Sequence, residues 1–494
     1  MDFLPVVLFT DWLVFLLLAV VAVTVWYVRR KEHLRAPWRR VAHSRSGMVG
    51  LTVLLVFVVI GLLDSLHFRP RLSNPDPDAK AAYAVEVLSV LDVALEPLRA
   101  RREKTYSAPL ASRLYAKEAI ELGDGRQVRE YPRLRFGGAR LADPDNERDA
   151  DIFRRTLAGV ALGAIAWLVV ALVVCVLIAR RTDGHMASAW RAVWHGETEV
   201  PWSAILVTAA VLLVGAVVIV TLSAEYFVFG TDKVGQDVLY QALKSIRTAL
   251  VIGTLTTLVM LPFAIGLGIM AGYFGGWIDD VIQYVYTMLN SIPGVLLIAA
   301  AVLLVQLHID THPEWFPTSL QRADLRLLFL CLILGITTWT GLCRLLRGET
   351  LKLKELEYIL AAHALGVRHH RIIARHILPN VMHIVLISVV MEFSGLVLAE
   401  AVLSYVGVGV DPSMNSFGTM INNARLEMAR EPMVWWSLAA AFVFMFVLVL
   451  AANLFADAVR DAFDPRVRTR VLSAQRLLKL LAGGPARATE ARGS

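Results

Sequence analysis

The feature that most constrains this chain is a series of apolar runs, each about 20 residues long, separated by short charged segments. A run of that length crosses the hydrocarbon layer as a helix, because a helix satisfies its own backbone hydrogen bonds there. A sliding hydropathy window places about nine such runs: Phe3–Val28, Met48–Leu66, Thr156–Ile178, Ser203–Phe227, Thr248–Met270, Val281–Gln306, Leu325–Leu346, Val381–Val406 and Trp435–Ala456. The sequence therefore predicts an all-α polytopic membrane protein.

Composition excludes other classes of protein. Hydrophobic residues make up 57% of the chain and charged residues 18%, which leaves too little polar material to cover a soluble domain. The net charge of +7 does not indicate a nucleic-acid partner, because Lys and Arg gather beside the apolar runs, where they set membrane orientation. The three cysteines lie inside apolar runs without the spacing of a disulfide framework or a thiolate metal site. We assign no metal site.

Basic residues predict the orientation of the spans. The segment 29–45 holds seven Lys or Arg and the single acid Glu32, and the segments 344–375 and 458–494 are also mainly basic. With about nine spans, all three fall on one side, which the positive-inside rule makes cytoplasmic. The N-terminus is therefore expected outside and the C-terminus in the cytoplasm.

The long segment 67–155 then falls on the outer side. Its charges nearly cancel, it opens with a Pro-rich stretch at 74–78, and its centre at 81–98 has apolar residues at helical intervals. This pattern predicts a small, partly helical extracytoplasmic insert, with a disordered linker as the alternative.

A short basic segment between two apolar runs, EYILAAHALGVRHHRIIARHILPN at 357–380, has a helical pattern. Tyr358, Ala361 and Leu365 share one face of a first helix, and Gly366 supplies the freedom to turn. A second helix from about residue 369 to 378 leads to Pro379, which suits the first turn of the next span. The predicted helical hairpin either docks into a groove on another protein or anchors the loop to acidic lipid.

This segment resembles the EAA loop of permease subunits of ABC importers. Ala361, Ala362, Gly366, Leu378 and Pro379 stand at the family's spacing, whereas Leu360 occupies the position of the family's motif Glu. The resemblance implies a loop that couples the spans to ATPase subunits, and we assign to it Glu357, Ala361, Ala362, Gly366, Arg368, Leu378 and Pro379.

Three further stretches resemble the dipeptide, oligopeptide and nickel branch of these importers: FGTDKVGQDVL at 229–239, AGYFGGWIDD at 271–280 and AEAVLSYVGVGVDP at 399–412. Gln236 stands where that branch usually has Arg, so a salt bridge is not expected there.

The resemblance implies a six-helix permease core at 203–466, with the coupling loop at 344–380. Outside it we expect two N-terminal transmembrane helices with a basic cytoplasmic loop at 1–66, the insert at 67–155, an extra transmembrane helix and loop at 156–202, and a basic cytoplasmic tail at 467–494. The additions need not shape the pathway, and the insert is expected to be an accessory surface where a binding protein docks.

The chain has no GxxxxGK[ST] phosphate loop, and we assign it no catalytic residue and no cofactor. The resemblance implies a transport subunit of the bacterial inner membrane that imports peptides or a similar small solute. It also implies a second permease subunit in a heterodimer, two ATPase subunits that use ATP and Mg²⁺, and an extracytoplasmic solute-binding protein. A secondary carrier or a membrane scaffold with an extracytoplasmic domain is the alternative.

Two carboxylates inside one predicted span are candidates for the translocation path. Glu392 and Glu400 are eight residues apart, about two helical turns, and so lie near one face. Ionisable side chains in a span usually face a protein interior or water because exposure to lipid is costly. Hydrogen bonding to a neighbouring helix is the alternative role.

Overall fold

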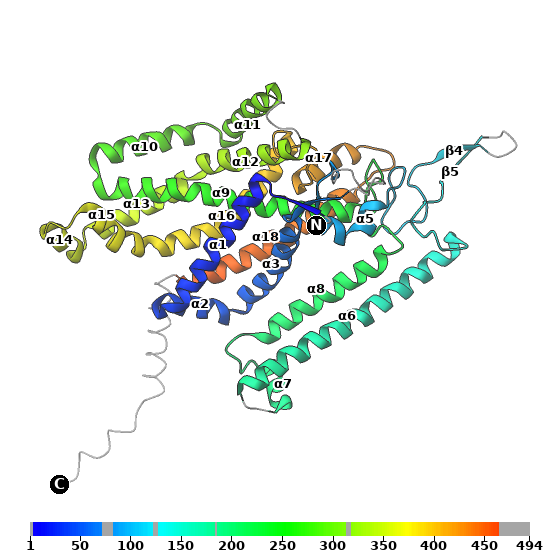
Figure 1. The fold of residues 1–494 in the computed structure, drawn as a ribbon, viewed down its shortest axis with the longest axis horizontal. Helices are drawn as coiled ribbons and strands as arrows, with labels where there is room; N and C mark the ends of the chain where they lie inside the picture. Colours follow the sequence, from blue (N-terminus) through cyan, green and yellow to red (C-terminus); the bar gives the residue numbers. More distant parts are fainter. Residues whose placement is uncertain (1–2, 72–82, 122–126, 183–184, 313–317, 464–494) are drawn as a thin grey trace, which may run out of the picture.

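The computed structural model describes residues 3–71, 83–121, 127–182, 185–312 and 318–463. Within these ranges, nine helices are long and apolar enough to cross a membrane, which confirms a polytopic helical protein (Figure 1): Phe9–Arg30, Arg45–Asp64, Pro144–Arg180, Trp202–Ser223, Val238–Phe274, Gly294–Thr311, Ser319–Lys354, His369–Val406 and Trp436–Phe463. The Pro-rich stretch 74–78 and the basic tail 467–494 lie outside the described residues.

The N-terminal part forms a helical hairpin with a small sheet at its outer end. Its elements are β1 (Phe3–Val6), α1 (Phe9–Arg30), α2 (Glu32–His43), α3 (Arg45–Asp64), β2 (His67–Pro70) and β3 (Leu88–Ser89). Strand β2 pairs antiparallel with both β1 and β3, so the chain entering α1 is joined to the chain leaving α3. The first apolar run thus begins as a strand, because its backbone pairs with β2.

The insert contains more irregular chain than helix. Its short elements are α4 (Val90–Ala94), α5 (Glu96–Ala100), β4 (Glu118–Glu121) and β5 (Gln127–Glu130), and the last two form a two-stranded antiparallel hairpin. Ser89 caps α4 by accepting a hydrogen bond from the backbone N–H of Asp92. The helical periodicity at 81–98 therefore yields two single-turn helices.

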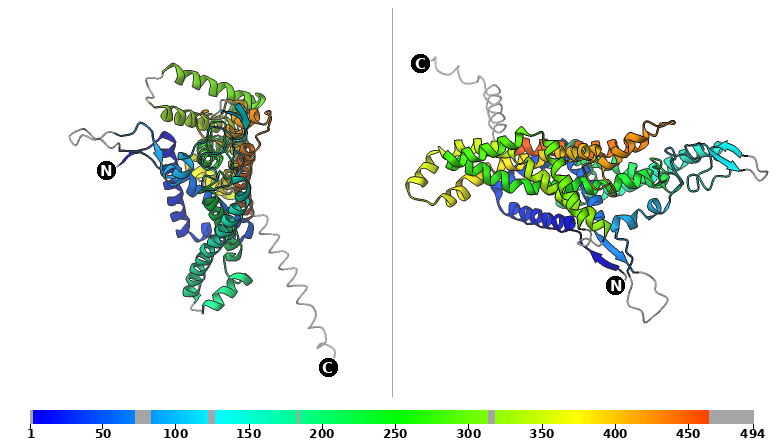
Figure 2. Two further views of the ribbon diagram at one scale, coloured as in Figure 1. Left: turned by 90° about the vertical axis from the view of Figure 1, so that its right-hand side faces the viewer. Right: turned by 90° about the horizontal axis from the view of Figure 1, so that it is seen from above.

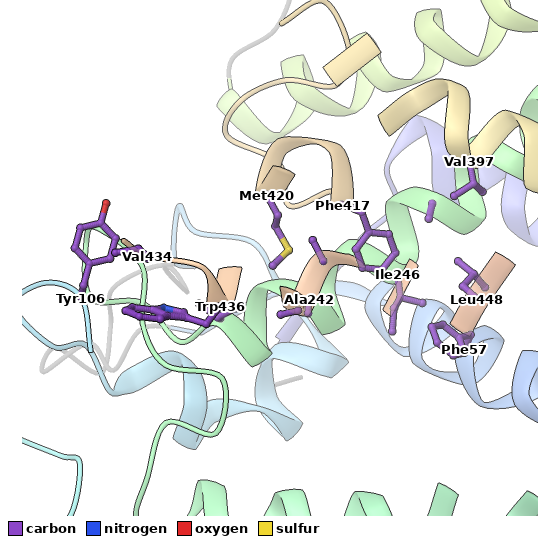
Figure 3. Packing of buried hydrophobic residues seen from close by; sticks show 14 residues of the cluster. Phe57, Tyr106, Ala242, Ile246, Val397, Phe417, Met420, Val434, Trp436 and Leu448 are labelled. Atoms are coloured by element: carbon purple, nitrogen blue, oxygen red, sulfur yellow. The ribbon is translucent and has the colours of Figure 1, made fainter. Parts of the chain in front are cut away.

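The insert also packs against the segments expected to form the permease core, and docking of a binding protein on it stays a prediction. The backbone N–H of Glu103 donates to the carbonyl of Gly235 at 2.9 Å, and that of Leu110 donates to Phe227 at 2.9 Å. Tyr106 is 6% exposed and belongs to an apolar cluster (Figure 3). Most other members of this cluster come from α3, α9 (Val238–Phe274), α16 (Leu378–Val406), α17 (Phe417–Glu427) and α18 (Trp436–Phe463). The cluster joins the N-terminal additions to the segments expected to form the permease core.

The third and fourth spans form a second helical hairpin beside the main bundle (Figure 1). It consists of α6 (Pro144–Thr182), α7 (Met186–His195) and α8 (Trp202–Ser223). Gly159 and Gly163 of α6 let the backbone of α8 approach closely, and Trp167 donates from Nε1 to the carbonyl of Leu206 at 2.8 Å. The structure thus groups α8, the predicted first helix of the core, with the extra helix α6.

The main bundle contains several long helices that run roughly along the longest axis of the molecule, joined by shorter helices (Figures 1 and 2). Its elements are α9 (Val238–Phe274), α10 (Gly276–Ser291), α11 (Gly294–Thr311), α12 (Ser319–Thr338), α13 (Thr340–Lys354), α14 (Glu357–Ala364), α15 (His369–Ile372), a π-helical turn (Ile373–Ile377), α16 (Leu378–Val406), α17 (Phe417–Glu427) and α18 (Trp436–Phe463). Helix α9 is the centre, because α3, α12, α13 and α16 all pack against it.

Two prolines that lie within predicted spans, Pro262 and Pro293, affect their helices differently. The predicted span Val281–Gln306 is interrupted at Ile292 and Pro293, so α10 and α11 are separate helices. A proline lacks the amide donor and its ring crowds the preceding turn, which favours a break. Pro262, by contrast, lies inside the continuous helix α9.

Candidate functional site

The segment that resembles the coupling loop forms a surface hairpin, residues 357–377, at one end of the long axis (Figure 1). Helix α14 ends where Gly366 adopts a φ of +72°, a left-handed conformation that glycine takes without steric cost. The backbone N–H of Gly366 donates to His363 and that of Val367 to Ala362, at 3.0 and 3.1 Å. These bonds satisfy the last carbonyls of α14 and fix the turn.

The second arm of the hairpin continues directly into a membrane span. Arg368 precedes α15, the π-helical turn follows, and α16 begins at Leu378 without a break. Pro379 lies in the first turn of α16, where its missing amide costs little. A displacement of the hairpin tip would therefore be transmitted along one helical rod into the bundle.

Buried isoleucines hold the hairpin against the bundle. Ile359, Ile372 and Ile377 are at most 2% exposed and belong to one cluster with Cys343 and Leu346 of α13. The hydroxyl of Tyr273, at the end of α9, lies 2.8 Å from Nδ1 of His369. The hairpin is therefore a fixed projection of the bundle.

The outer face of the hairpin is apolar and exposed. Leu360 is 54% and Leu365 83% exposed, and Ala361 is exposed beside them. Of the other residues assigned from sequence, Glu357, Gly366, Arg368 and Pro379 are exposed, and Ala362 and Leu378 are half-buried. The structure thus brings an apolar tip and a flanking cation together on a protruding surface.

A bidentate ion pair braces the base of this region. Nε and Nη2 of Arg347 in α13 lie 2.6 and 2.7 Å from the two carboxylate oxygens of Asp279 in α10. The hydrogen bond from Arg347 lowers the pKa of Asp279 below its usual range, so the carboxylate is ionised at neutral pH. The pair fixes the start of α10 against α13.

The two candidate pathway carboxylates have different environments. Glu400 is 1% exposed, and its Oε1 accepts hydrogen bonds from the hydroxyls of Ser404 and Ser416, at 2.6 and 3.0 Å. Glu400 thus secures the turn that follows α16. Glu392 is half-buried and has no hydrogen-bond or ion-pair partner among the described residues. A pathway role for either remains a prediction, and the geometry favours Glu392.

The FGTDKVGQDVL stretch forms a tight outer turn before α9. Oδ1 of Asp232 accepts hydrogen bonds from the backbone N–H groups of Val234 and Gln236, each at 2.9 Å, and Oδ2 accepts from Gln241 at 2.7 Å. Gly235 has a φ of +73°, and a Cβ there would lie 1.8 Å from the carbonyl oxygen of Glu103. Glycine is required because the insert backbone presses on this turn.

Sequence reasoning missed a buried charge network, here called the α1 network. Nη2 of Arg247 in α9 lies 2.7 Å from Oδ1 of Asp11 in α1 and 3.7 Å from Oδ1 of Asp324 in α12. The backbone N–H of Thr10 donates to Asp324 at 3.0 Å, and His67 binds the second oxygen of Asp11 at 2.8 Å. The network ties the N-terminal helix to two helices of the bundle.

A second network, one helical turn earlier on α9, fastens the insert. Nζ of Lys244 lies 2.5 Å from Oδ1 of Asp64 in α3 and 3.0 Å from Oδ1 of Asp92 in α4. Burial alone would raise the pKa of Asp92, but Lys244 and hydrogen bonds from Ser89 and Tyr240 outweigh it and lower that pKa. The sequence signal for both charge networks is the presence of charged residues at the ends of apolar runs. The sequence does not reveal which of these residues pair, because the partners lie far apart along the chain.

The sequence of the chain is similar to those of known transport proteins. Residues 264–469 match the family model described as the inner membrane component of binding-protein-dependent transport systems. The chain is 33% identical over 240 residues to the oligopeptide transport system permease protein OppC of Mycobacterium bovis, which covers 49% of this chain and 76% of that protein.

Two further relatives carry related names. The chain is 30% identical over 242 residues to the dipeptide transport system permease protein DppC of Lactococcus lactis, covering 49% of this chain and 64% of that protein. It is 32% identical over 242 residues to the glutathione transport system permease protein GsiD of Pectobacterium atrosepticum, covering 49% of this chain and 73% of that protein. The residues that match the family model, 264–469, contain the surface hairpin.

Proposed function

Because the chain belongs to the family of permease subunits of binding-protein-dependent ABC importers, we propose that it forms one half of the translocation pathway of an ATP-driven peptide importer. The observation that carries the proposal is the surface hairpin, a fixed helical projection that runs without a break into α16. Such importers work as assemblies, so this multi-pass subunit of the bacterial inner membrane acts with permease, ATPase and binding-protein partners.

The surface hairpin is the element that couples this chain to an ATPase subunit. Its exposed apolar tip, with Leu360, Ala361 and Leu365, fits a groove in another protein as a short helix does, and Arg368 adds a charge at the rim. ATP and Mg²⁺ are used in two such partner subunits. Closure of the ATPases shifts the bundle between inward-open and outward-open states only if nucleotide changes the free-energy difference between those states.

A peptide is the substrate class that the relatives support. The three relatives are named for oligopeptide, dipeptide and glutathione transport, which share a peptide backbone. Glu392 is the residue of this chain placed to meet a peptide's ammonium group, because its carboxylate is half-buried in α16 and has no partner among the described residues. A second permease subunit of different sequence completes the pathway, and a solute-binding protein delivers the peptide from outside.

The orientation follows from charge and the position of the hairpin. The arginine-rich helix α2 connects α1 and α3 (Figure 1). It lies toward the same end of the molecule as the surface hairpin. The positive-inside rule makes that end cytoplasmic. The N-terminus is accordingly outside and the C-terminal end of α18 faces the cytoplasm.

A charge placed on the tip tests the coupling role. Leu365→Glu should abolish retention of the ATPase subunits on the purified permease and with it ATP-driven uptake, because the apolar contact is lost while the fold of the exposed tip is undisturbed. Val85→Glu is the matched control, since Val85 is also an 83% exposed apolar residue but lies in the insert on the opposite side.

The outcomes separate the two functions considered. Normal ATPase retention in the Leu365→Glu variant would overturn the coupling assignment. Peptide uptake driven by an ion gradient in vesicles without ATPase subunits would instead favour a secondary carrier.

A further inference from the structure

A narrow apolar crevice, here called the α1 crevice, separates the N-terminal helix α1 from the bundle. Its larger part has a volume of about 380 Å³ and is walled by α1, α3, α9, α16 and α18. A smaller part of about 140 Å³ adjoins it toward the outer side, and Leu17, Val58, Leu250 and Thr254 line both parts. The crevice is therefore one continuous slot beside α9.

The wall of the larger part is hydrocarbon. Its two hydroxyl groups, on Thr254 and Thr257, donate within helix α9 to the carbonyls of Leu250 and Gly253, each at 2.7 Å. The two hydroxyl protons are thus already used within α9, so they are not available to a polar ligand. An occupant of this slot must be apolar along its length.

The crevice persists because α1 is held at its ends. At the outer end the α1 network joins Asp11 to Arg247, and β1 pairs with β2. At the other end α2 turns the chain back into α3, and its Val41 is buried against α18. Between these attachments α1 runs along one side of the bundle (Figure 2), and the space beside it is unfilled by side chains.

Helix α2 lies next to the larger part of the crevice and carries a cationic surface. Val390 and Phe455 line the crevice and also pack into the cluster that contains Val41, so the wall of the slot continues into α2. Arg35, Arg39 and Arg40 of α2 are exposed and make no ion pair within the described part of the chain. In the orientation proposed above, these arginines lie at the cytoplasmic membrane surface.

The depth of the headgroup layer at this point is marked by α1 itself. The guanidinium of Arg30 lies 3.7 Å from the ring centroid of Trp26, which is 54% exposed. Exposed tryptophan beside arginine is typical of the membrane–water interface. The end of α1 and the start of α2 therefore lie where lipid headgroups lie.

We propose that the α1 crevice binds one acyl chain of an anionic phospholipid of the cytoplasmic leaflet, whose phosphate is held by the arginines of α2. Guanidinium groups suit phosphate because their planar donors bind its oxygens in pairs. The wall along α9 runs from Arg247 to Leu261, a separation of 14 positions that corresponds to about 21 Å at about 1.5 Å per residue. One leaflet provides about 15 Å of hydrocarbon, so a single acyl chain fits within that length.

Photocrosslinking on the intact transport complex tests the tail site. The complex in nanodiscs would be labelled with a phosphatidylglycerol that carries a diazirine in one acyl chain, and the labelled peptides identified by mass spectrometry. Labelling is expected on the walls of the crevice at 14–21 and 250–261. Leu17→Trp and, separately, Leu54→Trp should lower that labelling at least fivefold, because either indole fills the slot.

The matched control is Leu304→Trp, which places the same ring on a 70% exposed position of α11 and should leave the crevice labelling unchanged. Absence of labelling at 14–21 and 250–261 in the unmodified protein would overturn the proposal, since the slot would then be closed. Equal labelling in the two crevice variants and the unmodified protein would also overturn it.

The headgroup site has its own test. Unlabelled phosphatidylglycerol should compete for the crevice labelling several-fold better than phosphatidylcholine, and the combined change Arg35→Gln, Arg39→Gln and Arg40→Gln should remove this preference. A control with the same charge change on the insert, Arg102→Gln, Lys117→Gln and Arg129→Gln, should retain it. Equal competition by the two lipids in the unmodified protein would overturn the anionic assignment.

Discussion

Asp11 of α1 and Arg247 of α9 form a buried ion pair, with Oδ1 2.7 Å from Nη2 and both side chains at most 6% exposed. The two residues are 236 positions apart, and only Arg247 lies in the part expected from sequence to form the permease core. The pair therefore makes the N-terminal helix a structural component of that core. It also explains why α1 cannot be treated as a detachable addition.

Removing one partner of this pair should destabilise the whole bundle. Asp11→Ala leaves the more distant Asp324 as the remaining ion-pair partner of Arg247 among the described residues, and an incompletely compensated buried charge costs about 3–5 kcal/mol. Thermal unfolding of the detergent-solubilised protein would measure the loss. Leu16→Ala, on the lipid-exposed face of the same helix, is the control and should change the melting temperature little. Equal melting temperatures for the two variants would contradict a stabilising role of the pair.

Stability should depend on pH through Asp237, which precedes α9 and is 1% exposed. Burial raises the pKa of Asp237 from 3.8 to about 7, so the folded protein retains a proton that the unfolded chain loses. This proton stabilises the folded state fully when the pH is below the pKa of Asp237 in the unfolded chain. The stabilisation is lost as the pH rises through the pKa of Asp237 in the folded protein. Between about pH 5 and about pH 7 the loss is about 2 kcal/mol.

The test is thermal unfolding across this pH range. Asp237→Asn should flatten the dependence, because an amide can still accept the hydrogen bond from the backbone N–H of Leu239 but does not titrate. An unchanged pH profile in this variant would assign the dependence to other groups.

The turn at Gly366 should be needed for transport. Alanine at a φ of +72° costs about 1–2 kcal/mol, so Gly366→Ala is expected to lower ATP-driven peptide uptake several-fold in proteoliposomes. Gly348→Ala is the matched control, because a Cβ at either glycine meets no atom within 4 Å and Gly348 has an ordinary helical backbone. Equal uptake by both variants would show that the turn geometry does not limit transport.

Glu400 and Glu392 should respond differently to substitution. Glu400→Ala leaves the hydroxyls of Ser404 and Ser416 without their buried acceptor, which costs about 1–3 kcal/mol each and should lower the melting temperature. Glu392→Gln should leave the melting temperature unchanged and alter the concentration dependence of uptake, because its half-exposed carboxylate has no partner to lose among the described residues. Unaltered uptake in Glu392→Gln would remove it from the pathway.

The helical elements of the fold could be predicted because their signals are local. Each apolar run of about 20 residues carries the information that it spans a membrane. Eight predicted spans differ from the candidate spans of the structure mainly at their ends, and the predicted span Val281–Gln306 is divided between α10 and α11. The hairpin was likewise visible, since Gly366 and Pro379 mark its turn and its exit. Local steric rules act over a few residues, which the sequence shows directly.

What only the tertiary structure decided is which distant segments meet. Lys244 and Arg247 look like two cations at the end of one apolar run, and nothing local reveals that the first binds Asp92 of the insert and the second Asp11 of α1. Glu400 and Glu392 likewise share a helix, yet one is buried against Ser416 and the other is half-exposed. The sequence by itself determined the membrane helices and the hairpin, because hydrophobicity and backbone sterics are properties of contiguous residues. The packing of these helices determined the charge partners and the α1 crevice, because burial and ion pairing depend on side chains that come together only in the folded chain.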